Sequence, residues 1–395
     1  MIVITIAIFL SESRAGILAI LTATAVFFLL RPDILSKFRT IKYAKLLMGL
    51  TFVFILTGAF ILYHKKKDSA NGRILIWQVS WEMIKDKPVL GHGYGAFQAE
   101  YMNYQAEYFK NKPDSEFELL ADNVKHPFNE FVKLAVEFGI TGLVVVLLVI
   151  LFVLWKLMKS KDQNSPLVLS GLLSFLVFAC FSYPLQYIAV WLLLAFYLSV
   201  LLPSKKIRFE NTPFVLIAKS LIIIACVFSL YNIINHIKLE IRWKTIALNS
   251  LKGNTEKMLP EYEKLYSASL NRNPFFLYNY GAELNVANRF DKSIDVLTEC
   301  QQQFNDYDLQ MLLADNYDKK GEADKAIQTY QHASNMVPCR FLPLYKLFNI
   351  YRLAGAETKA KEIALEIVSK KIKVPSYTVS SIRAEAEEYI SGTAR

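Results

Sequence analysis

The chain has 395 residues, of which 53% are hydrophobic and 20% are charged, and its formal net charge is +10. The hydrophobic share exceeds that of an ordinary soluble domain, and the basic residues gather in short loops between apolar runs, as on the cytoplasmic side of membrane proteins. The charge therefore indicates membrane topology and argues against a nucleic-acid partner, and the four cysteines lack a metal-binding spacing.

The first residues, "MIVITIAIFL", are apolar but cover only about half of a bilayer. They lack the basic region and the cleavage site of a signal peptide. This pattern is typical of the end of a longer helix. We therefore expect a partial first span, and we interpret the sequence as a fragment that lacks earlier spans.

Further apolar runs are long enough to cross a bilayer. They lie at about residues 15–30, 46–63, 139–155, 166–182, 187–202 and 214–231. The loops rich in Lys and Arg alternate with less basic connections, which places the basic loops in the cytoplasm. The motif "SESR", the loop 64–138, the turn "SYPLQ" and everything after about residue 232 then face outward. The sequence thus predicts an all-α fold with a polytopic bundle of about six full spans.

The outer loop 64–138 has helical patterns of its own. "RILIWQVSWEMI" has apolar residues at helical spacing and ends at Lys87-Pro88, and "EFVKLAVEF" is amphipathic and leads into the next span. A loop of this length with its own helices is usually functional.

Beyond residue 232 the sequence is polar, helical and repetitive. Ser293, Ala326 and Ala360 are equivalent positions at the tetratricopeptide period of about 34 residues. Gly281 and Ala314 fill the small position where paired helices touch, whereas the third repeat has Phe348 there. The resemblance to tetratricopeptide repeats covers about residues 240–372 and predicts an α-solenoid. We therefore divide the chain into a transmembrane domain, 1–231, and a repeat domain, 232–395. The repeats either stack only on each other or bind a partner protein.

Two arginines are candidates for anion binding on the outer side. Arg14 follows "SES" between two apolar runs, and Arg73 lies about one turn into a predicted helix. Guanidinium groups keep their charge and bind phosphate oxygens in pairs, so the two together could hold a diphosphate. The alternatives are a snorkelling anchor for Arg14 and a solvated helix residue for Arg73.

Two histidines are candidates for proton transfer. His92 lies in "GHGYGAF", whose glycines either admit an anion or only form a tight turn. His126 precedes Pro127, Asn129 is expected to cap the following helix, and Glu137 lies on the same face two turns later. A neutral imidazole can take a proton from a hydroxyl group, and a nearby Glu could orient it.

Three motifs occur in the order "SxSRAG", "GRxxIW…KDKPVLGHGYGAF" and "HPFNEF…EFGITGL". Together they resemble the O-antigen ligase family, which also includes O-antigen polymerases and bacterial O-oligosaccharyltransferases. The resemblance covers about residues 1–231. The repeat domain resembles one found in some bacterial members.

The resemblance implies a metal-independent glycan transfer, without cofactors, in the bacterial inner membrane. The donor would be a glycan linked to undecaprenyl diphosphate, and the acceptor a hydroxyl group of a lipid, protein or polysaccharide on the periplasmic side. Arg14 and Arg73 would bind the diphosphate, and the loop histidine would activate the acceptor. The family usually shows His directly before Asn, whereas this chain has His126-Pro127-Phe128-Asn129. His126 is therefore displaced by two positions, and His92 stays an alternative base.

Other functions fit parts of the sequence. A polymerase of the same family would join glycan units on the lipid carrier. A membrane-anchored scaffold would recruit partners through the repeats and would have no need of the arginine and histidine set. A transporter would place charged residues within its spans, and the sequence has almost none there.

Overall fold

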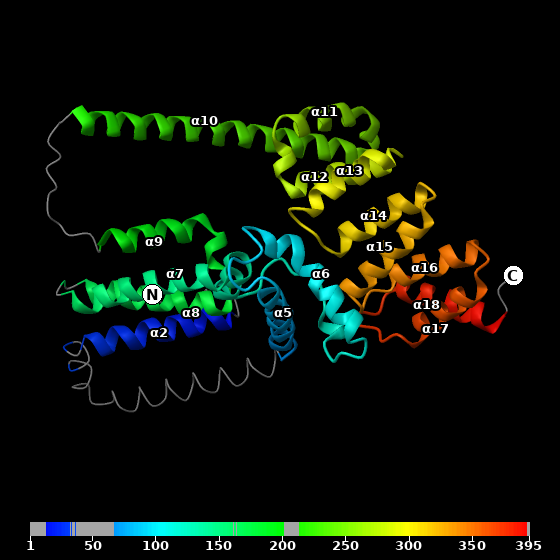
Figure 1. Ribbon diagram of the computed structural model, residues 1–395, viewed down its shortest axis with the longest axis horizontal. Helices are drawn as coiled ribbons and strands as arrows, with labels where there is room; N and C mark the ends of the chain where they lie inside the picture. The colour runs from blue at the N-terminus through cyan, green and yellow to red at the C-terminus, as the bar shows by residue number, and fades with distance from the viewer. Residues whose placement is uncertain are drawn as a thin grey trace. The chain divides into compact units, whose positions relative to one another are not determined.

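The computed structural model describes residues 13–31, 33, 36, 67–160, 162, 164–200 and 213–392. Every regular element in these ranges is a helix, which confirms the all-α fold class (Figure 1). The contacts divide the chain into unit 1 (Met1–Tyr104 and Val124–Pro203) and unit 2 (Gln105–Asn123 and Ser204–Arg395). The domain boundary at residue 231 stays a prediction, and a single helix, α10 (Pro213–Asn249), runs through that position.

The helices of unit 1 come from the apolar runs and the outer loop. They are α2 (Arg14–Leu30), α5 (Lys67–Asp86), the beginning of α6 (Ala96–Asn111), α7 (Glu130–Lys159), α8 (Ser165–Phe181), the short 3-10 helix η2 (Pro184–Gln186) and α9 (Ile188–Val200). Polar caps set where two of them begin. The Ser13 hydroxyl accepts a hydrogen bond from the Gly16 amide at the start of α2, and Asn129 caps α7 as predicted.

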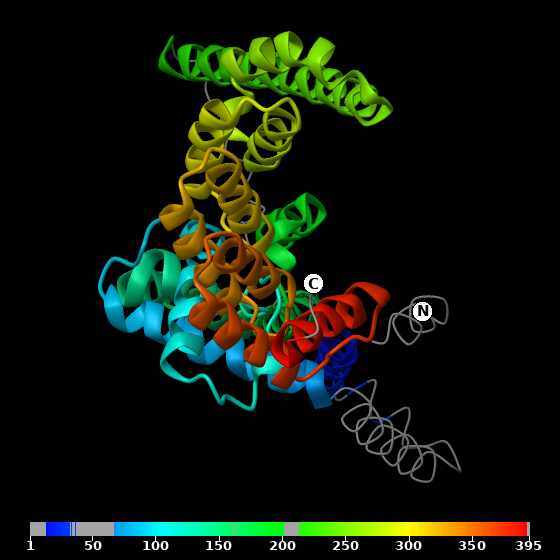
Figure 2. The same cartoon turned by 90° about the vertical axis from the view of Figure 1, so that its right-hand side faces the viewer.

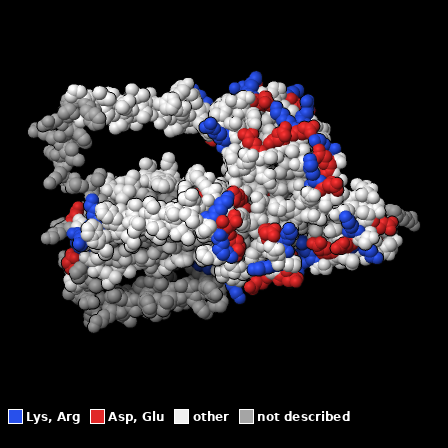
Figure 3. Space-filling view, viewed as in Figure 1, with Lys and Arg blue, Asp and Glu red and all other residues white. Residues whose placement is uncertain are grey.

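The number of membrane spans is not confirmed. Helix α7 and the segment Val215–Ser267 are long and apolar enough to cross a membrane. Helices α2 and α8 have 17 residues each and α9 has 13, so these apolar helices are shorter. The run at 46–63 and the first residues, 1–12, lie outside the described residues. The face of α2, α7, α8 and α9 seen in Figure 3 has charged atoms at the ends of the helices and few in between.

The loop 87–95 packs against a kink in α7. Gly139 has φ +66°, which interrupts the helix, and the loop packs against this interruption. The amides of His92 and Gly93 donate to the carbonyls of Val136 and Glu137, at 2.9 Å each. The Ile140 amide donates in turn to the Pro88 carbonyl at 2.8 Å. The loop thus supplies partners for backbone groups that the kink removes from the helix.

Unit 2 contains the last part of α6, the short 3-10 helix η1 (Glu118–Leu120) and the helices that follow α10. These are the π-helical turn η3 (Ser250–Asn254), α11 (Thr255–Ser267), η4 (Leu270–Arg272), α12 (Pro274–Val286), α13 (Phe290–Gln301), α14 (Tyr307–Lys319), α15 (Ala323–Met336), α16 (Leu342–Leu353), α17 (Glu357–Ser369) and α18 (Tyr377–Ser391). The hairpins α12–α13, α14–α15 and α16–α17 follow one another in a stack (Figure 2).

The predicted repeat positions lie at the helix contacts. Ser293, Ala326 and Ala360 are fully buried, and the Ser293 hydroxyl donates to the Gly281 carbonyl at 2.7 Å. A Cβ on Gly281 would lie 2.5 Å from the Leu297 side chain, which explains the small residue there. Phe348 departs from this rule because its ring packs edge-on against Tyr389 of α18, at 5.1 Å between centroids. The last repeat therefore has a larger space to fill.

Candidate functional site

The segment 126–129 is fixed on both sides of Phe128. The Trp77 indole on α5 donates to the Pro127 carbonyl at 2.8 Å, and Asn129 Oδ1 accepts from the amides of Phe131 and Val132 at 2.9 and 3.1 Å. Phe128 has φ +53°, a left-handed conformation that is unfavourable for a bulky residue. Such strain persists only where the surrounding contacts determine it, and it concentrates at functional sites.

His126 lies against the turn between α8 and α9. Gln186 Nε2 is 3.0 Å from His126 Nδ1, and the Tyr183 ring is 4.7 Å from the imidazole ring. Burial lowers the pKa of His126 to about 4, and the positive charges of Lys133 and Lys125 act in the same direction. The imidazole is therefore neutral at neutral pH, which is the form that can accept a proton.

The orientation of the Gln186 amide determines which ring nitrogen can accept that proton. With its nitrogen toward the ring, Gln186 donates to Nδ1, and the ring proton resides on Nε2. Rotating the amide by half a turn presents the oxygen to an Nδ1 proton and leaves the Nε2 lone pair free. His126 can act as a base through Nε2 only in the second arrangement.

Glu137 is buried away from the His126 ring. Its carboxylate accepts from the amides of Gly95 and Phe97, at the start of α6, and lies 4.0 Å from the Lys133 ammonium group. Among the described residues, none of its contacts reaches His126. A carboxylate in this place stabilises the N-terminus of α6 through the helix dipole.

A second carboxylate, which sequence reasoning did not select, reaches the turn beside His126. Glu130 Oε1 accepts a hydrogen bond from the Leu185 amide at 2.8 Å. Because Leu185 lies between Tyr183 and Gln186, this bond fixes the turn that contacts the imidazole.

His92 is a buried histidine whose two ring nitrogens both face oxygen atoms. Its Nε2 lies 2.8 Å from the Met83 carbonyl, and its Nδ1 lies 2.7 Å from a Glu100 carboxylate oxygen, without the alignment of a hydrogen bond. Both neighbours are acceptors, so neither ring nitrogen faces open space in which an acceptor hydroxyl could bind.

The glycine directly before His92 serves close backbone packing. A Cβ on Gly91 would lie 2.5 Å from the backbone of Glu137 and Gly139. The first glycine of "GHGYG" therefore allows the loop to approach α7, as expected for the tight-turn reading of this motif.

Arg14 and Arg73 line one pocket of about 320 Å³. The other lining residues are mostly apolar: Ala15, Leu18, Ala70, Ile74, Trp77 and Phe181. Arg14 Nη2 lies 3.4 Å from the Ser69 hydroxyl, and Arg73 Nη1 donates to the Phe181 carbonyl at 3.0 Å. Burial lowers the pKa of Arg73, and the positive charge of Arg14 lowers it further. Two like charges in an apolar pocket favour an anion between them.

A row of aromatic rings connects this pocket with His126. The Arg73 guanidinium lies over the Phe128 ring at 5.1 Å, Phe128 contacts Tyr183 at 5.4 Å, and Tyr183 contacts His126. His126 does not line the pocket itself. The structure thus brings Arg14, Arg73 and His126 to the same end of the helices α2, α7 and α8.

Comparison with known protein families concerns the same part of the chain. Residues 1–147 match the family model of the O-antigen ligases. The match includes all of the predicted site residues and confirms the family resemblance of this region. Among the solved structures that are similar to the chain, two are described as crystal structures of MamA. The first is 19% identical, covers 39% of this chain and 88% of that one, and has a TM-score of 0.31. The second is 21% identical, covers 36% and 88%, and has a TM-score of 0.29. No curated protein matches the chain.

The match to the O-antigen ligases ends before the turn 183–186. Sequence reasoning also missed this turn, although "SYPLQ" was expected on the same side of the membrane as the outer loop. That shared side was the signal that could have pointed to Tyr183 and Gln186 as neighbours of His126. Nothing in the local sequence indicates the Phe181 carbonyl as a partner of Arg73.

Proposed function

We propose that the protein is a glycosyltransferase of the O-antigen ligase type in the bacterial inner membrane. It moves a glycan from undecaprenyl diphosphate to a hydroxyl acceptor on the periplasmic side. The observation that carries this proposal is the pocket shared by Arg14 and Arg73, connected to a neutral His126. The exposed apolar side chains along α7 and α10 support the membrane location.

In the proposed reaction the acceptor oxygen attacks the anomeric carbon of the donor sugar. The bond from this carbon to the diphosphate oxygen breaks, with inversion, and the diphosphate leaves on its lipid. The acceptor hydroxyl proton passes to His126 Nε2, while the Gln186 amide, turned so that its oxygen faces the ring, accepts the Nδ1 proton. Arg14 and Arg73 balance the charge that develops on the leaving diphosphate, which is the role that a metal ion has in other transferases.

The structure favours different roles for the remaining predicted residues. Asn129 and Glu137 support the site by capping α7 and holding the start of α6. Of the two histidines, His126 is the one that we assign as the base, because both ring nitrogens of His92 face acceptors.

Transfer by the purified full-length protein in lipid nanodiscs tests the proposal, with a glycan on undecaprenyl diphosphate as donor. We expect Arg73→Ala and His126→Ala each to lower the transfer rate by about 100-fold or more. Arg31→Ala and His236→Ala are matched controls, since these side chains contact Asp33 and Glu240 and do not line the pocket, and we expect both variants to keep full activity. Full activity in the Arg73→Ala/His126→Ala double variant would show that the mechanism is wrong.

A polymerase of the same family is the second candidate, because the same donor site serves both reactions. Deleting the protein from its cell separates the two. Loss of glycan attachment indicates a ligase, and shorter glycans indicate a polymerase. A membrane-anchored scaffold would give neither result and would leave purified donor unchanged.

A further inference from the structure

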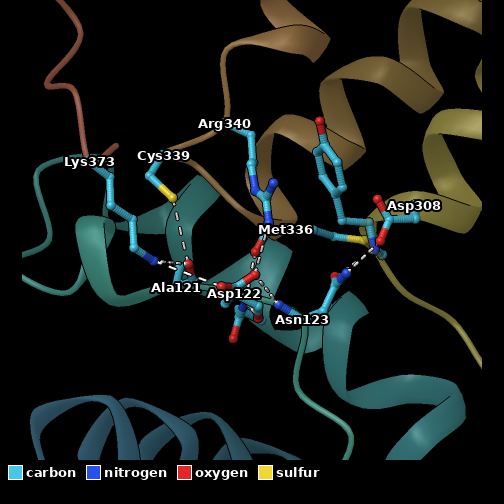
Figure 4. A network of polar contacts seen from close by, with 10 residues as sticks. Ala121, Asp122, Asn123, Asp308, Met336, Cys339, Arg340 and Lys373 are labelled. Atoms are coloured by element: carbon cyan, nitrogen blue, oxygen red, sulfur yellow. Dashed lines mark hydrogen bonds and ion pairs between the residues drawn. The ribbon is translucent and has the colours of Figure 1, made fainter. Parts of the chain in front are cut away.

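Residues 105–123 of the outer loop pack with the repeats of unit 2. At the start of this segment, Gln105 Nε2 donates to the Met336 carbonyl, the last residue of α15, at 2.6 Å. At its end, the Ala121 carbonyl accepts from Cys339 Sγ at 3.6 Å and from Lys373 Nζ at 3.4 Å. Figure 4 shows the side chains of Cys339 and Lys373 pointing toward Ala121.

The two polar residues that follow Ala121 are held through their side chains (Figure 4). Asp122 Oδ1 lies 3.2 Å from Arg340 Nη2, and its other oxygen lies 3.9 Å from Lys373 Nζ. Asn123 uses both ends of its amide: Oδ1 accepts from the Tyr307 amide at 3.0 Å, and Nδ2 donates to Asp308 at 2.9 Å. The segment thus has specific side-chain partners, as a bound peptide has.

These partners come from equivalent positions of successive repeats. Tyr307, Arg340 and Lys373 follow one another at intervals of 33 residues, which is close to the repeat period. Tyr307 begins α14, Arg340 lies before α16, and Lys373 lies before α18. These three connections between helices form one row. Each connection contacts one of the three consecutive residues Ala121 to Asn123. Such regular presentation is how solenoid repeats bind extended ligands.

We propose that the ligand of this row of connections is the protein's own outer loop, and that the repeats thereby hold the segment that leads to His126. Only Val124 and Lys125 separate the bound residues from this histidine. Asn123, Asp122 and their partners are positioning residues in this scheme. The binding of the loop does not depend on any reaction, and only its purpose in catalysis rests on the proposed function.

An isosteric exchange of Asn123 and Asp308 tests the proposal in the full-length protein. Asn123→Asp removes the donor and places two carboxylates in contact, whereas Asn123→Asp together with Asp308→Asn restores one donor and one acceptor. Asn111→Asp is the matched control, because it places the same carboxylate against Glu107 within the segment. Hydrogen exchange of residues 118–128 is the main readout, and the kcat and KM of transfer are the second.

We expect Asn123→Asp to speed exchange across residues 118–128 by about fivefold or more and to lower kcat more than it raises KM. The double variant should return both quantities to within about twofold of the original protein. Unchanged exchange in Asn123→Asp, or no recovery in the double variant, would overturn the binding of the loop. Faster exchange that stops at residue 123 would overturn its effect on His126. Neither exchange result depends on activity, so a failure of the proposed reaction is recognised separately.

Discussion

The repeats of unit 2 use one kind of contact several times, whereas the candidate site in unit 1 uses each of its contacts once. In the repeats, the buried small residues Ser293, Ala326 and Ala360 recur at one period and fill the same role. Around His126, the Trp77 indole, the Asn129 cap and the strained Phe128 each make a different kind of contact. The difference teaches that the repeats are stabilised by hydrophobic cores shared between neighbouring helices, whereas the site depends on individual side-chain contacts.

The largest expected effect comes from removing core volume in the repeats. Phe348→Ala deletes a fully buried ring that contacts Tyr389 of α18, so we expect a loss of about 3–5 kcal/mol in the free energy of unfolding of this part of the chain. Denaturant unfolding followed by circular dichroism measures it. Leu353→Ala is the control, since that side chain is 85% exposed, and it should change stability by less than about 0.5 kcal/mol. A small effect of Phe348→Ala would mean that its ring does not stabilise the hydrophobic cluster of the last repeats.

This comparison also explains what the sequence could predict. The helical periodicity, the repeat length and the helix cap at Asn129 depend on patterns that are visible within short stretches of sequence. They could therefore be predicted. The partners of His126 and Arg73 lie 60 and 108 residues away in the chain, and no local pattern specifies them. The expected link between Glu137 and His126 illustrates the limit. Spacing placed them near each other in the chain, but the carboxylate is engaged by the start of α6.

A second, slightly smaller effect is expected at the kink of α7. Gly139 has a left-handed conformation, and Gly139→Ala places a Cβ 2.2 Å from the Val89 carbonyl oxygen. The nearest atoms all belong to the backbone of Val89 and Leu90, which can shift only at a high energetic cost. We expect a local loss of about 3 kcal/mol, confined to the loop 87–95 and the kink. Hydrogen exchange measures it as faster exchange of the amides of Gly91 to Gly93.

Gly72→Ala is the control for this variant. Nothing lies within 4 Å of a Cβ at Gly72, which is inside α5, and alanine favours a helix by up to about 1 kcal/mol. Gly72→Ala should leave hydrogen exchange in the loop 87–95 unchanged or slower. If Gly139→Ala instead unfolded the whole of unit 1 in one step, then unit 1 would have a shared core like that of the repeats.

The third prediction concerns the pH dependence of transfer. Because the pKa of His126 is lowered to about 4, the base is available throughout the range above this value, and kcat/KM should fall only as pH drops toward it. Gln186→Glu places a carboxylate beside Nδ1, which favours the Nδ1 proton and raises the pKa of His126. The acidic limb of the pH profile should then move upward.

Gln98→Glu is a control for this variant, because it adds the same charge on α6 and not in the turn that contacts the imidazole. If the acidic limb of the pH profile stays in place in Gln186→Glu, while His126→Ala abolishes transfer, then this limb reports the titration of another group. The contribution of His126 to folding stability also decreases as pH falls. It is complete above the unfolded pKa of about 6.5 and is lost as pH falls from there toward 4, because the folded state resists protonation.

The smallest expected effect separates the two roles of Glu137. Glu137→Gln keeps an acceptor for the amides of Gly95 and Phe97 but removes the charge at the start of α6, which should lower stability by about 0.3–1 kcal/mol. Since none of its described contacts reaches His126, the pH profile of transfer should keep its acidic limb. A variant whose stability is unchanged but whose limb shifts would assign Glu137 to the orientation of His126, and the site would then resemble the arrangement that the sequence spacing suggested. The present geometry instead makes Glu137 a support for the loop, with Gln186 as the residue that sets the tautomer of the proposed base.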